Sequence, residues 1–385
     1  MFNRSDIRKN EYMLVRGLAK QGYDWWWHSF TGRSETTGKE RAFFVEFFIC
    51  NPALSEDKPV LGQLPENRRL GKRPSYLMVK AGAWGEDRCQ LHRFFSLKEA
   101  EIHGRAPFSV SAADCYCSDG ILKGSVEVSS EDASAHPEFM CGSGSMRWDL
   151  RLEKKTAFNV GYGTSRLFRF LEAFEMYWHA EGMKTLYSGT VIYNGEKYTV
   201  DPETSFGYAD KNWGRGFTSP WVWLSSCDLT SNLTGRALTD SVFDIGGGRP
   251  KIWFLSLDRK LLSAFWYEGK PYEFNFSKFW TRTGTEFDFK ETEDAVFWHV
   301  RQETRTAVME TEVSCRKEDM ILVNYEAPDG TKRHNRLWNG GNGTGNVKLW
   351  EKRDGGLVLI DDISFAHCGC EYGEYGPPES SSRLP

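Results

Sequence analysis

The sequence lacks the features that mark membrane-spanning, nucleic-acid-binding and secreted proteins. It contains no run of eighteen apolar residues, so no membrane-spanning helix is predicted. The formal net charge is −4, so no basic surface for nucleic acid is expected. The N-terminal segment has no continuous apolar core and does not resemble a secretory signal. The nine cysteines lie mostly singly in apolar runs, which indicates reduced thiols and a cytoplasmic location.

The signatures of common metal and cofactor sites are also missing. The cysteine pairs at 115–117 and 368–370 have one residue between them, whereas paired zinc ligands usually have two to four. The three glycines at 246–248 lack the Lys-Ser/Thr of a phosphate-binding loop and the spacing of a dinucleotide fingerprint. No Gly-x-Ser-x-Gly elbow occurs, which excludes an α/β-hydrolase. We therefore expect neither a metal nor a cofactor.

Glycine-rich and charged segments have simple structural interpretations. The glycines at 246–248 lie between two strand-like runs and predict a turn. The glycine-rich segment 339–345 predicts a flexible loop by the same argument. The charged groups at 301–303 and 332–336 are interpreted as solvated strand faces.

Aromatic residues, in contrast, are abundant. Trp, Tyr and Phe make up 15% of the chain, with 15 Trp, 15 Tyr and 26 Phe. Aromatic side chains favour strands, and they also line most ligand pockets. Both interpretations hold together in a barrel that encloses a hydrophobic ligand.

The chain reads as β structure over most of its length. From about residue 40, short runs of Phe, Val, Tyr and Trp alternate with turn residues, which predicts sandwiches or barrels. Asn194-Gly195 predicts a type I′ hairpin between two alternating runs. Apolar spacing predicts helices only at about 5–20 and 164–174. The length favours two β domains in tandem that join near residue 200.

Three segments combine ionisable groups with aromatic rings, at 24–29, 175–181 and 210–213. On a strand, residues of one parity share a face, so Glu175, Tyr177, His179 and Glu181 would project together. Carboxylates and imidazole among aromatic rings are suited to acid–base chemistry, because burial raises the pKa of a carboxyl group. The alternatives are a hydrogen-bonded structural network or an exterior polar face.

The segment 206–226, FGYADKNWGRGFTSPWVWLSS, resembles the signature of the tocopherol cyclase family. The matching residues are Gly207, Tyr208, Lys211, Asn212, Trp213, Gly214, Phe217, Trp221 and Trp223. The stretch FEMYWHAEG at 174–182 is similar to the family's Met-Glu-Cys-Tyr-His segment, which makes Glu175 and His179 the counterparts. Asp210 replaces the family's Glu, as in the related carotenoid 1,2-hydratases.

The resemblance implies an all-β fold of two tandem lipocalin-like barrel or sandwich domains with few short helices. The expected parts are an N-terminal helical arm at 1–22, β domains at 23–200 and 201–375, and a disordered tail at 376–385. The related proteins, which include fungal lipocalin-like pericyclases, work without metal or nucleotide. The function implied is a cofactor-independent cyclase, isomerase or hydratase that acts on a hydrophobic isoprenoid or polycyclic molecule between the two domains.

The resemblance also implies which residues form the site. The expected catalytic residues are Glu175, His179, Asp210 and Lys211. The expected substrate-binding residues are Trp25, Trp27, His28, Tyr177, Tyr208, Asn212, Trp213, Trp221 and Trp223. Asp210 and Lys211 could equally pair with each other and anchor the domains, which would leave the chemistry to Glu175 and His179. A further alternative is a non-catalytic carrier of a hydrophobic ligand, which needs the pocket but not the acid.

Overall fold

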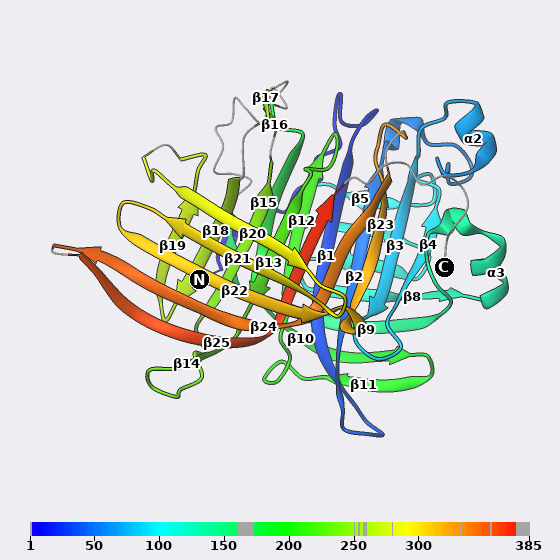
Figure 1. The fold of residues 1–385 in the computed structure, drawn as a ribbon. Helices are drawn as coiled ribbons and strands as arrows, with labels where there is room; N and C mark the ends of the chain where they lie inside the picture. Colours follow the sequence, from blue (N-terminus) through cyan, green and yellow to red (C-terminus); the bar gives the residue numbers. More distant parts are fainter. Residues whose placement is uncertain are drawn as a thin grey trace.

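The computed structural model describes residues 2–159, 173–249, 251–252, 255–256, 260–278, 280–330, 333–354 and 356–374. Nearly all of this part of the chain belongs to two large antiparallel β-sheets, which lie side by side in Figure 1. Both sheets curl into barrel-like shapes, so the prediction of an all-β fold with few short helices is confirmed.

The first sheet has twelve strands in the order β4-β3-β2-β1-β11-β10-β9-β8-β7-β6-β5, with β12 also paired to β1 and β10. Its strands are β1 (Tyr23–Ser34), β2 (Glu40–Cys50), β3 (Tyr76–Ala83), β4 (Cys89–Phe95), β5 (Glu101–His103), β6 (Ser109–Ala112), β7 (Cys115–Ser118), β8 (Ile121–Val128), β9 (Gly144–Phe158), β10 (Met176–Tyr193), β11 (Glu196–Val200) and β12 (Tyr208–Gly214). The predicted hairpin at Asn194-Gly195 is confirmed, since both residues have positive φ and join β10 to β11.

The second sheet has eleven strands in the order β19-β18-β15-β13-β25-β24-β22-β21-β20, with β14 on β25 and β23 on β24. Its strands are β13 (Trp221–Ser226), β14 (Asp228–Ser231), β15 (Val242–Gly248), β18 (Lys260–Tyr267), β19 (Lys270–Asn275), β20 (Gly284–Glu291), β21 (Ala295–Glu303), β22 (Ala307–Arg316), β23 (Met320–Glu326), β24 (Arg333–Arg353) and β25 (Gly356–Glu374). A separate pair is formed by β16 (Lys251–Ile252) and β17 (Leu255–Ser256). The sheets therefore change over between Gly214 and Trp221, while the predicted division into domains stays a prediction.

Three hydrophobic cores hold the molecule together. One fills the first sheet and includes Trp26, Phe43 and Tyr187, and another fills the second sheet around Phe243 and Phe265. The third lies between the sheets and takes residues from both, among them Tyr23, Trp27, Phe44, Phe48 and Tyr76 from the first and Trp223, Val242, Val323, Tyr325 and Leu337 from the second. Burial of this third core joins the two sheets into one packed body.

Helices are short in the described residues: α1 (Arg4–Ile7), α2 (Pro65–Arg69), α3 (Ser130–Ala135) and the 3₁₀ turns η1 (Pro52–Leu54), η2 (Pro137–Phe139) and η4 (Lys317–Asp319). The predicted helix at 5–20 is wrong beyond α1. After α1, the amides of Tyr12 and Met13 donate to Gly104 O and to the Asp24 carboxylate, so tertiary contacts replace helical hydrogen bonds. The predicted helix at 164–174 lies outside the described residues except for its last two positions.

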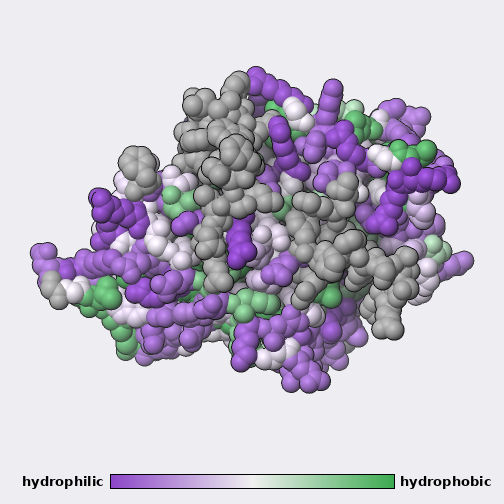
Figure 2. Space-filling model, turned by 45° about the horizontal axis from the view of Figure 1, so that its top comes forward, coloured by the Kyte–Doolittle hydropathy of each residue, from purple (hydrophilic) through white to green (hydrophobic). Residues whose placement is uncertain are grey.

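The outer surface is predominantly hydrophilic, as Figure 2 shows for one face. Large exposed apolar side chains are scattered, and a short group of them, Leu357, Val358 and Leu359, lies near the start of β25. None of the helices in the described part of the chain is long and apolar enough to cross a lipid bilayer.

Candidate active site

The predicted site residues lie on three neighbouring strands, with β12 between β1 and β10. Because side chains alternate along a strand, each of these strands presents one face to the second sheet and the other to the core of the first sheet. Tyr208, Asp210 and Asn212 face the second sheet, whereas Lys211 and Trp213 face the first sheet's own core. The predicted residues therefore form two separate groups.

The group between the sheets is organised around Tyr208. Its hydroxyl lies 3.1 Å from Oδ2 of Asp210, which is on the same strand, and 3.2 Å from Oδ2 of Asp244 in β15 of the second sheet. Asp210 is 7% exposed and Asp244 is 0% exposed. Two buried carboxyl groups from different sheets therefore share one phenol hydroxyl.

This geometry favours a protonated carboxyl group. A phenol hydroxyl has one hydrogen, so Tyr208 can donate to only one of the two aspartates. The other short contact is a hydrogen bond only if that carboxyl group carries a proton and donates it to the phenol oxygen. Two like charges at such a site in a low-dielectric layer would also repel strongly, as in other carboxyl pairs.

Electrostatics lead to the same conclusion. Burial raises the pKa of Asp210 well above its usual range, and the nearby Glu371 adds to the effect. Burial, followed by the charge of Asp210, does the same to the pKa of Asp244. Burial also raises the pKa of Glu371 to about 7, and it raises the pKa of Tyr208, which keeps the phenol neutral. At neutral pH this layer therefore holds proton donors.

Indole rings supply both walls and hydrogen bonds to these carboxyl groups. Trp178 Nε1 donates to Asp210 Oδ2 at 2.8 Å, and Trp223 Nε1 donates to Asp244 Oδ1 at 3.1 Å. Trp221 Nε1 donates to Glu371 Oε2 at 2.8 Å. Trp25 and Trp27 share this face and stack on Tyr325 at 5.3 Å and on Phe44 at 5.2 Å between ring centroids. The acids thus lie in an aromatic layer built from both sheets.

Several buried polar atoms on this face have no hydrogen-bond partner among the described residues. They are Asp210 Oδ1, Trp27 Nε1, Glu46 Oε1 and Asn212 Nδ2. Trp27 pairs with Asp210 on one side and with Glu46 on the other, so three of the four atoms belong to residues directly opposite one another. Buried polar groups are normally hydrogen-bonded, so a cluster of exceptions marks where a ligand's polar groups can bind.

One buried cation accompanies the carboxyl groups. Lys80 Nζ lies 2.9 Å from Glu46 Oε2 and 3.6 Å from the ring centroid of Tyr325, with both charged side chains fully buried. Tyr325 donates a hydrogen bond to Glu46 Oε2 at 3.1 Å. This ion pair neutralises one carboxylate of the layer, whereas neither Asp210 nor Asp244 has a paired cation among the described residues.

Two small cavities border the aromatic layer. One of about 60 Å³ is lined by Trp178, Trp221, Met176 and the glycines 246–248. The other, about 20 Å³, is lined by Trp25, Phe217, Trp221 and Glu371, and the two cavities share Met176, Thr218 and Trp221. Drug-sized ligands occupy roughly 300–1,000 Å³, so a substrate would have to displace side chains such as Met176 and Trp221.

The remaining predicted residues on these strands face the core of the first sheet. Lys211 Nζ lies 2.5 Å from Asp24 Oδ1, with both side chains fully buried, so the alternative of an Asp210–Lys211 ion pair is wrong. Alternation along the strand explains this, because adjacent residues point to opposite faces. Lys211 also lies over the ring of Trp26 at 4.4 Å.

Two histidines and two aromatic residues lie on the same inner face. His179 Nδ1 is 3.2 Å from the carbonyl of Phe158, and His28 Nδ1 is 2.8 Å from the hydroxyl of Tyr187. Burial lowers the pKa of each histidine to about 3, so both are neutral at physiological pH. Tyr177 stacks on Trp213 with ring centroids 5.4 Å apart. None of these contacts reaches Asp210.

Glu175 immediately precedes β10 and is partly buried. Its carbonyl accepts the amide of Arg215 at 2.8 Å, which places it beyond the end of β12. Asp210 is four residues back along β12 from Gly214, so the two acids are separated by roughly 13 Å or more along the strand direction. Tyr177, His179 and Glu181 share the inner face, as alternation predicts, since Tyr177 belongs to the first sheet's core and the charges of Lys154 and Lys211 act on both His179 and Glu181. Glu175 lies before the strand and is not part of this row.

The second sheet contributes site residues that were not predicted from the sequence. Asp244 precedes the glycines 246–248, and Glu371 lies within the segment CGCEYGEYG near the C-terminal end. Trp178 lies within the segment FEMYWHAEG but was not among the predicted site residues. The sequence feature that could have indicated Asp244 and Glu371 is an acidic residue within a strand-like run that is otherwise rich in apolar residues. No group of three or more His, Cys, Asp or Glu side chains in the described residues is arranged to hold a metal ion.

Comparison with known proteins adds the following relationships. The sequence model of a family described as tocopherol cyclase-like matches residues 118–374. A chloroplastic protein of Oryza sativa subsp. japonica, described as a probable tocopherol cyclase, is 34% identical over 103 residues. That match covers 26% of this chain and 20% of the rice protein, so this chain matches about a fifth of that relative's length.

Two solved structures follow a similar chain course at low identity. An AttH-type protein from Nitrosomonas europaea is 13% identical with a TM-score of 0.47, covering 92% of this chain and 93% of its own. Kievitone hydratase from Nectria haematococca is 12% identical with a TM-score of 0.45, covering 94% of this chain and 93% of its own.

Proposed function

The chain belongs to the tocopherol cyclase-like family, and from this premise we propose that it is a cofactor-independent cyclase, isomerase or hydratase. Its substrate is a hydrophobic isoprenoid or polycyclic molecule that binds in the aromatic layer between the sheets. The acid is Asp210. The observation that carries the proposal is the Asp210–Tyr208–Asp244 group, whose geometry favours a protonated carboxyl in a buried aromatic setting.

Asp210 suits the role of proton donor because its two oxygens differ. Oδ2 accepts hydrogen bonds from Trp178 and Tyr208, whereas Oδ1 is buried and has no partner among the described residues. The proposed position of the proton is Oδ1, where no group of the described residues competes for it. Its raised pKa matches an acid that works near neutral pH.

The proposed step transfers this proton to an alkene carbon. The O–H bond of Asp210 breaks, a C–H bond forms from the alkene's π electrons, and a carbocation remains. An oxygen of the substrate or of water then adds to the cation and loses its proton to the Asp210 carboxylate. Trp27, Trp178 and Trp223 belong to the same buried cluster, and indole rings can stabilise positive charge.

Tyr208 and Asp244 complete a path for the proton. When Asp244 is protonated, its Oδ2–H can donate to the Tyr208 oxygen 3.2 Å away, while the Tyr208 hydroxyl donates to Asp210 Oδ2 at 3.1 Å. After Asp210 gives up its proton, a shift along this path spreads the negative charge over both aspartates. His179 is neutral and contacts the carbonyl of Phe158 in the first sheet, away from this path.

The test is turnover in D₂O of a panel of prenylated hydroquinones and linear polyprenyl hydrocarbons, followed by mass spectrometry. Protonation of an alkene adds one deuterium per product molecule at carbon. We expect Asp210→Asn to lower the rate by about 10²–10⁴-fold, since the variant keeps the shape but loses the proton. Return of every compound unchanged would instead fit a carrier and would contradict the proposal.

Two further variants make the result specific. Asp361→Asn is the matched control, because Asp361 is also buried and also accepts from a tyrosine, Tyr267, at 2.9 Å, but lies outside the aromatic layer. It should retain turnover. Full activity of Asp210→Asn together with loss in Glu175→Gln would move the acid to Glu175.

A further inference from the structure

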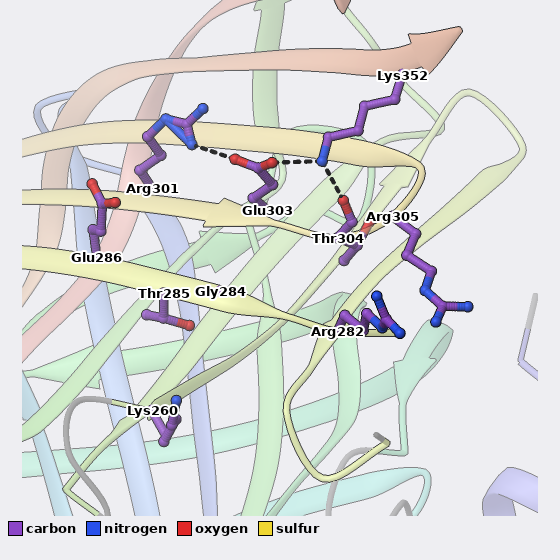
Figure 3. Close-up of a pocket in the computed structure, with 10 residues that line it drawn as sticks. All are labelled: Lys260, Arg282, Gly284, Thr285, Glu286, Arg301, Glu303, Thr304, Arg305 and Lys352. Carbon is purple, nitrogen blue, oxygen red and sulfur yellow. Dashed lines mark hydrogen bonds and ion pairs between the residues drawn. The ribbon is translucent and has the colours of Figure 1, made fainter. Parts of the chain in front are cut away.

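A further cavity lies at one end of the second sheet, and part of its lining was predicted to be a solvated strand face. Its volume is about 570 Å³. It is lined by Lys260, Arg282, Gly284, Thr285, Glu286, Arg301, Glu303, Thr304, Arg305 and Lys352, which Figure 3 draws. Five of these side chains are cationic and two are carboxylates, a surplus of three positive charges in a chain of net charge −4.

Internal ion pairs use part of this charge and leave the rest free. Arg301 Nη1 lies 3.1 Å from Glu303 Oε2, and Lys352 Nζ lies 2.5 Å from Glu303 Oε1. Figure 3 shows Glu303 between these two cations, whereas Arg282 and Arg305 extend toward the open space with no interaction drawn. Arg282, Arg305 and Lys260 have no ion pair with any described residue.

The two free arginines are brought together by the backbone. The amide of Arg305 donates to the carbonyl of Thr281 at 3.3 Å, so the turn after β21 touches the segment that carries Arg282. Arg282 also has a φ of 52°, which is uncommon for a residue with a side chain. Two guanidinium groups on touching segments repel each other unless an anion lies between them, and their planar forks match carboxylate and phosphate oxygens.

The cavity also adjoins the apolar one next to the candidate acid. Lys260 lines both, and the apolar cavity continues from Lys260 past Leu262 and Gly246 to Trp178, which donates to Asp210. A molecule with a charged group at Arg282 and Arg305 would therefore have an apolar surface beside it.

From these observations we infer that the cavity is an anion-binding site for a carboxylate or phosphate group, held by Arg282 and Arg305 and assisted by Lys260. The favoured ligand is amphiphilic, with its anionic group here and its apolar part in the neighbouring cavity. The link to a substrate rests on the proposed function, but the anion site itself does not depend on it.

The experiment measures binding by isothermal titration calorimetry, with pyrophosphate and dodecyl phosphate as probes and dodecanol as the uncharged comparison. Arg282→Gln and Arg305→Gln should each weaken the binding of both anions by about tenfold or more, because each removes a charge-assisted bidentate contact. Arg236→Gln is the matched control, since Arg236 is exposed in the same half of the chain and lies outside the cavity lining.

Each outcome bears on the proposal. Tighter binding of dodecyl phosphate than of pyrophosphate supports an amphiphile, whereas equal binding supports a free anion at the same site. Absence of saturable binding by the intact protein, or equal weakening in Arg236→Gln, overturns the inference. Because binding is measured without turnover, a failed proton donor at Asp210 and a failed anion site give different results.

Discussion

Asp244 is the part of the proposed acid group that can be tested without a substrate. It is fully buried, and its carboxyl oxygens lie near the Tyr208 hydroxyl and the Trp223 indole nitrogen. Its pKa is raised in the folded protein, mainly by burial. The folded state therefore keeps a proton that the unfolded chain loses above about pH 4.

The raised pKa of Asp244 makes the folded protein less stable as pH rises. When the folded state binds more protons than the unfolded state, the free energy of unfolding falls as pH rises, and it levels off above the folded pKa. Each unit of pKa difference corresponds to about 1.4 kcal/mol. The stability that Asp244 contributes is therefore present at low pH and lost as pH rises.

We expect Asp244→Asn to remove this dependence. The amide can still accept from Trp223 and donate to Tyr208, so its contacts match those of the protonated acid. The stability of the variant relative to the natural protein should increase between about pH 4 and pH 8. Urea unfolding across this range measures it, and a difference that does not change with pH would show that Asp244 is ionised in the folded state.

A variant that should change the pH dependence of stability in the opposite direction serves as the control. Hydrogen bonds from Lys270, Tyr272 and Arg353 hold the pKa of Glu351 at about 2, below its usual range. Its contribution is present above the unfolded pKa and lost as pH falls. Glu351→Gln should therefore reduce the loss of stability that occurs as pH falls below the unfolded pKa of Glu351. The pH dependence of stability above neutral pH should stay unchanged.

Glycines inside strands of the second sheet, rather than in turns, make room for the indole rings of the aromatic layer. Ideal Cβ atoms at Gly246, Gly341 and Gly369 would lie 2.8, 2.4 and 2.2 Å from ring atoms of Trp178, Trp84 and Trp223. In each case an indole ring of the aromatic layer lies directly on the backbone of a strand of the second sheet. The missing side chain creates the space for the ring.

This packing explains why two sequence-based predictions were wrong. Residues 246–248 form the end of β15 rather than a turn, and residues 339–345 lie within β24 rather than in a flexible loop. A single sequence shows the glycines but not the rings that lie on them, because Trp178 in β10 and Trp84, directly after β3, are remote along the chain. The hairpin at Asn194-Gly195 depends only on two adjacent residues that adopt positive φ, so it could be predicted, and the structure confirms it.

We expect Gly246→Ala to act on the acid through Trp178. A methyl group at 246 displaces the indole and breaks or lengthens its hydrogen bond to Asp210 Oδ2. The cost should be about 1–3 kcal/mol, as for other overpacked sites. Urea unfolding measures it, and Gly120→Ala is the control, because nothing lies within 4 Å of its added methyl group.

A double-mutant cycle identifies the cause. If the cost arises from the indole, Gly246→Ala combined with Trp178→Phe should be less destabilised than the sum of the two single variants. Additive effects would mean that the methyl group disturbs β15 itself and that Trp178 is not held by Gly246.

The candidate site exists only where the two sheets meet, which sets a limit on sequence analysis. Alternation along β12 is enough to place Asp210 and Lys211 on opposite faces, and this part was available from the sequence. The pairing of Asp210 with Asp244, or of Trp221 with Glu371, depends on how the sheets dock. Local patterns carry no information about such contacts, so an aromatic layer could be predicted and its acid pair could not.

The shared core between the sheets also predicts how the molecule unfolds. Many of its members are fully buried aromatic side chains, and separation of the sheets would expose them together with Asp210, Asp244 and Lys80. Exposure of this core would make each sheet unstable without the other. We therefore expect both sheets to unfold in one cooperative transition.

Buried thiols in each sheet report on this directly. Cys117 lies in the first sheet and Cys368 in the second, and both are fully or almost fully buried. In pulsed labelling with iodoacetamide at increasing urea, both should become reactive over the same urea range. Cys89 and Cys141 are partly exposed, so they should react before the transition and serve as an internal control.

A destabilising change confined to one sheet makes the test stronger. Phe43→Ala removes a fully buried ring from the core of the first sheet, at a cost of about 3–5 kcal/mol. If the sheets unfold together, the labelling midpoint of Cys368 in the second sheet should fall as far as that of Cys117. Persistent protection of Cys368 after Cys117 has reacted would mean that the second sheet folds independently, and the aromatic layer would then be an interface that can open without unfolding.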